Sequence, residues 1–319
     1  MLLRTALCTM LLAIASLAKA AEYPDHPVLI VAPYAAGGGL DVITRTLAQR
    51  LTTLWGHQVN VENRPGAGAT IGTAAVAKAK PDGYTLLVAS TPLGIAPVVY
   101  PNATYDARRD FLPLALIGTT PEVLVVNPAL GVNSAAELVA YAKKNSRHLN
   151  FGSAGSGTLA HVAAAAFNQR TGMGGTHVPY KGSNPALVDL MGGQIDWLFD
   201  TPSAVLQHSR AGKLRALAIA APQRSPQMPA VPTLAEAGFA DMDFRIWMGL
   251  LAPAGTPETV VRAIETALAE ILRDPALRAS LTAQGWDVVG SLSRDFASFL
   301  DAELPKLGAA ARAAGIKAD

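Results

Sequence analysis

Two glycine-rich segments contain the first candidates for binding chemistry. Residues 33–41 (Pro-Tyr-Ala-Ala-Gly-Gly-Gly-Leu-Asp) join an apolar run to a helical pattern, and residues 151–158 (Phe-Gly-Ser-Ala-Gly-Ser-Gly-Thr) have the same order. Glycine lets a backbone come close to a ligand, and the first N–H groups of a helix have no partner within it. These groups also lie at the positive end of the helix dipole. Both segments therefore predict an anion cradle without a cationic side chain, with a tight turn as the alternative for the first.

Neither segment fits the spacing of a catalytic or nucleotide-binding motif. The first lacks the third glycine of a dinucleotide fingerprint, because Val42 stands there, and no Gly-Lys-Ser/Thr follows. In the second, neither Ser153 nor Ser156 has a glycine two positions before it, as a nucleophile elbow requires. We expect His161, one turn into the next helix, to be packed or solvated. The sequence thus predicts no catalytic residue, and an exported hydrolase that uses these two serines and His161 is the remote alternative.

Two further segments end predicted strands with polar groups. Ser90 and Thr91 follow one strand, and Asp200 and Thr201 follow another. Ligands of open α/β sheets bind beyond the carboxyl ends of strands, so we expect these groups beside the two loops. Asp200 has two equal interpretations: it accepts a hydrogen bond from a ligand ammonium or hydroxyl, or it caps a helix that begins near Pro202.

Charge and residue types exclude several classes of function. The 319 residues include 26 Lys plus Arg and 24 Asp plus Glu. Two of the cations, Arg4 and Lys19, fall in the first twenty residues, so the rest of the chain is neutral and predicts no nucleic-acid partner. The six histidines show neither HxH nor HExxH spacing, and Cys8 is the single cysteine. We therefore expect no metal and no cofactor.

Residues 1–20 are predicted to be a cleaved signal peptide. Arg4 gives a positive start, residues 6–17 are mostly apolar, and Ala18-Lys19-Ala20 has the small-x-small pattern of a cleavage site. A membrane anchor is the alternative, but such a span needs about 20 apolar residues and this run is shorter. We expect an exported protein whose mature chain has no thiol.

Strand-like apolar runs alternate with helical patterns along the rest of the chain, which predicts an α/β fold with a largely parallel sheet. Strands are expected at residues 28–32, 85–89, 114–118, 123–127, 148–152, 175–179, 195–199, 214–220 and 246–252. Helices are expected at residues 41–54, 134–144, 258–272, 275–284 and 294–314. Two α/β domains follow, with the chain crossing between them twice: domain 1 at residues 21–120 and 248–319, and domain 2 at residues 121–247.

Many segments in the right order resemble the extracytoplasmic solute receptors of tripartite tricarboxylate transporters, the Bug or TctC family. The resemblance spans nearly the whole chain after residue 20. It is found at residues 23–27, 33–41, 61–68, 81–86, 151–157, 177–183, 192–196, 211–216, 231–238 and 249–257. The sequence departs from the family at Tyr34-Ala35-Ala36, where family members often carry Phe and Pro, and at Trp197, where smaller apolar residues are common.

The resemblance implies a periplasmic binding protein of type II, with two domains, a two-crossing hinge and a ligand cleft between them. It implies no catalysis, and a small carboxylate ligand: a mono-, di- or tricarboxylate or an amino acid. The receptor delivers it to the large and small membrane subunits of the transporter, or, as the alternative, presents it to a signalling partner; nothing demands more than a monomer. The implied ligand contacts are Tyr34, Ala35, Gly37, Gly38, Gly39, Ser90 and Thr91 in domain 1, and Ser153, Ala154, Gly155, Ser156, Thr158, Asp200 and Thr201 in domain 2.

Overall fold

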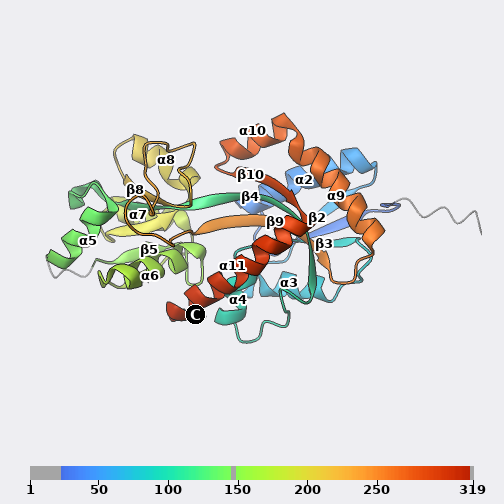
Figure 1. The fold of residues 1–319 in the computed structure, drawn as a ribbon, viewed down its shortest axis with the longest axis horizontal. Coiled ribbons are helices and arrows are strands. Elements are labelled where there is room, and N and C mark those ends of the chain that lie inside the picture. The colour runs from blue at the N-terminus through green and yellow to red at the C-terminus, as the bar shows by residue number, and fades with distance from the viewer. Residues whose placement is uncertain (1–22, 145–148, 317–319) are drawn as a thin grey trace, which may run out of the picture.

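Two lobes lie side by side along the long axis of the molecule (Figure 1). The computed structural model describes residues 23–144 and 149–316, and the predicted signal peptide lies outside these residues. Within the described residues, no helix is both long enough and apolar enough to span a bilayer.

The first lobe is built on parallel strands. β1 (Val28–Ala32) lies between β2 (Val59–Asn63) and β3 (Thr85–Ser90) and is parallel to both. β9 (Arg245–Pro253) runs antiparallel to β3. Parallel neighbours need long crossover connections, which here contain the first helices of the chain. The helices of this lobe are α2 (Gly39–Trp55), α3 (Thr70–Ala77), α4 (Pro92–Val99), α9 (Glu258–Arg273), α10 (Pro275–Ala283) and α11 (Ser293–Ala313).

The second lobe repeats this arrangement with shorter strands. β5 (Phe151–Ser153) is parallel to both β6 (His177–Pro179) and β7 (Trp197–Asp200). β8 (Arg215–Ala220) completes the lobe. Its helices are α5 (Ala135–Lys144), α6 (Leu159–Thr171), α7 (Ser183–Met191) and α8 (Pro202–Arg210).

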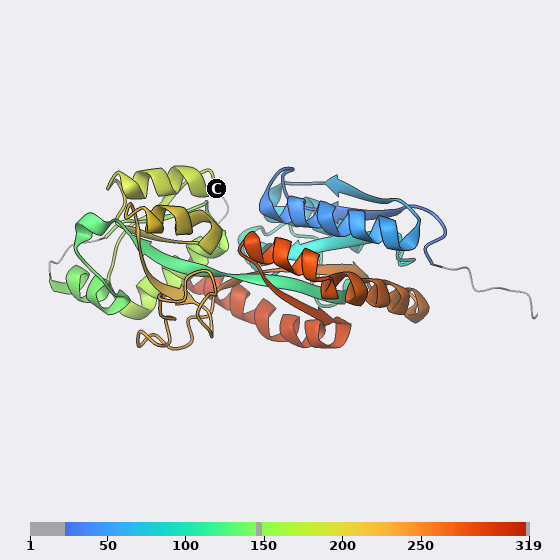
Figure 2. The same cartoon turned by 90° about the horizontal axis from the view of Figure 1, so that it is seen from above.

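One long strand, β4 (Phe111–Val126), connects the two lobes, as the view from above shows (Figure 2). It pairs with β9 in the first lobe and with β7 and β8 in the second. The prediction of two strands separated at residues 119–121 is therefore wrong. These residues, Thr-Thr-Pro, pair with residues 247–245 of β9, because threonine favours strands and a proline removes only one donor from the ladder.

Three elements of the structure, β2, β10 (Asp287–Leu292) and α4, were not predicted from the sequence. β2 alternates valine with polar residues and lies at an edge, and β10 pairs with β4 in a shifted register that contains a glycine. α4 begins with a proline and contains Gly94 and Pro97, which weaken any helical pattern. The other expected strands are present with bounds shifted by a few residues; residue 148, the expected start of one, lies outside the described part. Two short 3₁₀ helices complete the chain: Ala67–Ala69 and Pro128–Leu130.

The core of the second lobe is aromatic and continues into the first. Trp197 is fully buried, with its ring 4.9 Å from that of Phe151. This tryptophan, a departure from the family pattern, therefore belongs to the core. The same buried cluster includes Val99 of α4 and Leu307 of α11, which are elements of the first lobe. The two lobes are thus joined by shared side-chain packing as well as by β4.

Candidate functional site

The four predicted segments all lie at the carboxyl ends of strands. Residues 34–39 follow β1, and Ser90 ends β3; these two strands are parallel neighbours. Ser153 ends β5 and Asp200 ends β7, which are also parallel neighbours. Because parallel strands end at the same edge of a sheet, each lobe brings its two segments together.

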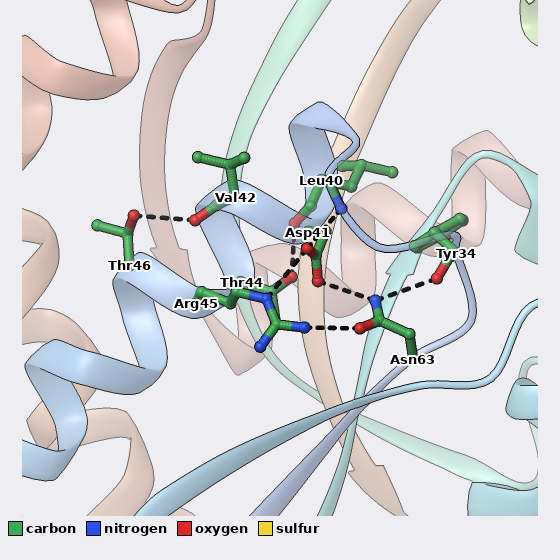
Figure 3. Close-up of polar contacts among 9 residues, drawn as sticks. Tyr34, Leu40, Asp41, Val42, Thr44, Arg45, Thr46 and Asn63 are labelled. Atoms are coloured by element: carbon green, nitrogen blue, oxygen red, sulfur yellow. Dashed lines mark hydrogen bonds and ion pairs between the residues drawn. The ribbon is translucent and has the colours of Figure 1, made fainter.

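The first loop is supported by the buried carboxylate of Asp41, in the first turn of α2. Its Oδ2 accepts the Gly37 N–H at 2.8 Å, and its Oδ1 accepts the Asn63 side-chain amide at 2.8 Å. The same Asn63 amide donates to the Tyr34 carbonyl at 3.1 Å, so both ends of the loop are attached to one network (Figure 3). Residues 35–39 are exposed, whereas Asp41 is only 2% exposed.

Arg45 neutralises this carboxylate. Its Nε donates to Asp41 at 3.0 Å and a terminal nitrogen donates to the Asn63 side-chain oxygen at 2.7 Å. Burial acts to raise the pKa of Asp41, but the hydrogen bonds from Gly37, Asn63 and Arg45 outweigh it and hold the pKa below its ordinary value. Asp41 therefore supports the loop as an ion pair and does not add a net negative charge to an anion cradle.

The network determines which N–H groups of the first loop face outward. Gly37 was predicted to contact a ligand, but its N–H points back to Asp41. Gly38 is the N-cap of α2 with no side-chain cap, and Gly39 begins the helix. Within residues 23–144 and 149–316, the structure gives the N–H groups of Gly38 and Gly39 no protein acceptor. Among the described residues, the N–H groups of Ala35 and Ala36 likewise have no acceptor, so these four amides are the donors that the first loop offers.

The second loop is held by its own hydroxyls. The Ser153 hydroxyl donates to the Gly155 carbonyl at 3.1 Å and lies 2.7 Å from His177 Nε2. The Thr158 hydroxyl donates to the same carbonyl at 2.8 Å, and Thr158 caps α6. The polar groups of Ser153 and Thr158 therefore shape the loop. In the described part of the chain, neither the hydroxyl nor the N–H of Ser156 has such a bond, so Ser156 supplies outward donors here.

An acceptor one turn into each helix holds a glycine N–H of the preceding loop. Gly157 donates to His161 Nδ1 at 3.3 Å, four residues on, just as Gly37 donates to Asp41. His161 is 8% exposed and stacks on His177 with ring centroids 3.6 Å apart, which confirms the packed role expected for it. We call these two contacts the loop braces. In the sequence, the one signal for each brace is an acceptor side chain four residues after a loop glycine.

Ser153 lies beside His177, but its surroundings do not suit a catalytic nucleophile. It is 1% exposed, and its hydroxyl is bonded within the loop as described above. The His161 expected for a hydrolase contacts Gly157 instead.

Ser90, Thr91 and Asp200 are buried, and Thr201 is partly buried. Among the described residues, the buried hydroxyl oxygen of Ser90 has no hydrogen-bond partner. Asp200 accepts the N–H of Thr201 at 2.8 Å and the hydroxyl of Ser183. Thr201, not Asp200, is the N-cap of α8, so the capping interpretation is wrong and the ligand contact stays a prediction.

A second buried acid, Glu122 of β4, lies near Asp200 and was not anticipated. Its neighbour Val123 pairs with Asp200 across the two strands. Burial, and then repulsion from Asp200, raise the pKa of Glu122 well above its ordinary value. Burial also raises the pKa of Asp200. The one signal for Glu122 in the sequence is a carboxylate inside an apolar run.

A cavity of about 130 Å³ opens between α4 and the second loop. It brings Ser156 and Thr158 next to Pro92, the residue that follows the Ser90–Thr91 segment. The lining does not include the first loop or Asp200 and Thr201. Among the described residues, no three histidine, cysteine or acidic side chains are grouped to hold a metal ion.

Comparison with known proteins finds a family model and relatives that match most of the chain. A model of the tripartite tricarboxylate transporter family receptor (TctC) matches residues 43–316. Protein BugT of Bordetella pertussis is 37% identical over 306 residues, which cover 95% of this chain and 94% of BugT. The structure of Rpa4515 of R. palustris with adipate is 32% identical and covers 93% of this chain and 100% of that one, with a TM-score of 0.80. The periplasmic binding protein BugD is 33% identical with the same coverage and a TM-score of 0.76.

A structure of MatC from Rhodopseudomonas palustris with bound malate is also similar. It is 31% identical and covers 91% of this chain and 100% of MatC, with a TM-score of 0.76. The fold described above is accordingly the α/β fold of periplasmic binding proteins.

Proposed function

The chain belongs to the tripartite tricarboxylate transporter receptor family, and from that premise we propose that it captures a small carboxylate between its lobes and delivers it to a membrane transporter of this type. The receptor has a binding role and not an enzymatic one. We propose that the ligand contacts come from the four strand-end segments, led by Gly38, Gly39 and Ser156.

One observation carries this proposal: each lobe presents a glycine-rich loop at the N-terminus of a helix, α2 in one and α6 in the other. A helix N-terminus stabilises an anion by about 0.3–1 kcal/mol, and each charge-assisted hydrogen bond adds roughly 1.5–3 kcal/mol. The acid beside the first loop, Asp41, is paired with Arg45 and so does not oppose a negative ligand.

Two relatives support a carboxylate as ligand, since Rpa4515 is known with adipate and MatC with malate. Relatives described as periplasmic support export of this chain, and cleavage near residue 20 is part of the same proposal. As part of the same proposal, domain 1 comprises residues 21–120 and 248–319, domain 2 comprises residues 121–247, and the large and small membrane subunits of a transporter are the partners.

Calorimetric titration and thermal-shift measurements test the proposal. The panel contains succinate, malate, adipate, citrate and aspartate, with glucose and Zn²⁺ as controls. We expect at least one carboxylate to bind and to raise the melting temperature, since a ligand at 100 times its Kd stabilises the folded state by about 2.7 kcal/mol. Binding of glucose or zinc with no carboxylate binding, or no binding at all, would contradict the proposal.

A further inference from the structure

One wall of the cavity beside the second loop is an apolar stripe on α4. Pro92, Ile95, Ala96 and Val99 recur at the spacing of one helix face, and Tyr100 follows them. Ile95, Ala96 and Val99 are otherwise buried, so the cavity is the place where this stripe is left uncovered. We call the cavity, defined by these residues and by Gly68 and residues 156–158, the α4 pocket.

The opposite wall offers few donors. Thr158 gives both its hydroxyl and its N–H to the Gly155 carbonyl, and Gly157 gives its N–H to His161. Among the described residues, this leaves the hydroxyl and the N–H of Ser156. Of the described residues that line the pocket, none carries a charge. Gly157 has a φ of +78°, and a Cβ there would lie 3.8 Å from Val99, so glycine keeps the space between the walls open.

The size of the α4 pocket fits a short chain of atoms. Its volume of about 130 Å³ exceeds what a single water molecule needs. A buried water needs two to four polar partners, and Pro92, Ile95, Ala96 and Val99 supply none through their side chains. Hydrocarbon is therefore the better occupant, because it loses no hydrogen bonds when it leaves water.

We propose that the α4 pocket holds the hydrocarbon part of the carboxylate ligand, with Ser156 at its polar edge. This inference rests on the proposed function and names its substrate class: acids with an unsubstituted aliphatic chain, in preference to hydroxylated acids. A hydroxyl on the chain would lie against Ile95 and Val99 without a partner, and that costs affinity.

The test is calorimetric titration with unbranched dicarboxylates from succinate upward, and with malate, which is succinate with one added hydroxyl. We expect affinity to rise about fourfold for each added methylene until the pocket is filled, which is the equivalent of ~0.8 kcal/mol per CH₂. Malate should bind more weakly than succinate.

Substitutions in the α4 wall test whether the dependence of affinity on chain length arises in the α4 pocket. Val99→Thr replaces a methyl group by a hydroxyl of similar size, and it should weaken the binding of long-chain dicarboxylates more than that of succinate, so that the gain per methylene falls. Ala96→Ser is a second, milder variant in case Val99→Thr unfolds. Val188→Thr is the matched control, because that side chain lies on α7 and is 61% exposed.

The outcomes separate the two proposals. Affinity that does not depend on chain length, or an equal loss for all ligands in both wall variants, would overturn the assignment of the α4 pocket and leave the carboxylate receptor standing. Binding of citrate without binding of any dicarboxylate would overturn this inference alone, whereas absence of binding by every carboxylate of the panel would overturn the proposed function and this inference with it.

Discussion

Asp41 shows how a single carboxylate can belong to an anion-binding loop. An unpaired acid at this position would repel a negative ligand. Here its charge is balanced by Arg45, and both oxygens accept hydrogen bonds from the loop or from Asn63. The position of the Gly38 and Gly39 amides thus depends on a side chain that we do not expect to touch the ligand.

Replacing Asp41 by alanine should weaken both the fold and ligand binding. Gly37 and Asn63 lose their acceptor, so we expect the free energy of unfolding to fall by about 1–2 kcal/mol; the half-exposed Arg45 is solvated by water and adds little. Urea unfolding and titration with the best carboxylate of the panel measure the two effects. Asp301→Ala, at an acid whose side chain is 74% exposed, is the control and should change neither. Normal affinity in Asp41→Ala would mean that the brace does not position the loop.

Glu122 predicts a pH dependence of stability. Its pKa is raised in the folded protein, so its contribution is fully present below the ordinary value of 4.5 and is lost as the pH rises through the raised pKa. Glu122→Gln removes this titration. We therefore expect the variant to gain stability relative to the wild type between pH 4.5 and pH 8, measured by urea unfolding at both values. Glu258→Gln, at an exposed acid, should follow the wild type, and a Glu122→Gln profile parallel to the wild type would contradict the prediction.

At the scale of elements, the sequence predicts what is local and misses what depends on a distant partner. The loop at residues 33–39 and the helix after it were predictable, because glycines and a helical pattern adjoin. Asn63 was not, because it comes to Asp41 from β2, which itself has little apolar signal. The strand β4 was divided at Thr119–Pro121 for the same reason: its partner there, β9, is more than a hundred residues away. α4, which forms the apolar wall, was hidden by its two prolines.

A substitution that covers the N–H groups at the N-terminus of α2 tests whether this helix end binds the ligand. Gly38 has a φ of −75°, and the nearest atom to an added Cβ is the Ala35 carbonyl oxygen at 3.7 Å, so the backbone accepts a Cβ at this exposed position. Its branched side chain should block the approach of a ligand to the N–H groups. We expect Gly38→Val to lower affinity at least about tenfold, which corresponds to one lost charge-assisted hydrogen bond, with little change in melting temperature.

Gly38→Ala is the graded control for this substitution, because its single methyl group covers less of the loop. An affinity that is unchanged in Gly38→Val would show that the first loop is a turn between β1 and α2 and does not contact the ligand.

At the scale of the whole molecule, the family resemblance implies that the lobes close on a ligand while they remain parts of one structure. Ligand-induced closure requires only that the closed form bind the ligand more tightly than the open form. The connections are extensive, because β4 pairs with strands of both lobes and α11 adds Leu307 to the core of the second lobe. We therefore expect any closure to occur by bending and twisting of β4 and β9 while the shared packing persists.

This shared packing predicts that the two lobes unfold together. The cluster that contains Trp197 and Phe167 of the second lobe also contains Ile95 and Val99 of α4, so melting of one lobe exposes apolar surface of the other. We expect one calorimetric transition whose calorimetric and van't Hoff enthalpies agree. Leu307→Ala, at a fully buried contact, should lower the free energy of unfolding by about 2–5 kcal/mol and shift this transition as a whole. Two resolved transitions, or a Leu307→Ala shift seen in only one of them, would show that the lobes are independent folding units despite their common strand.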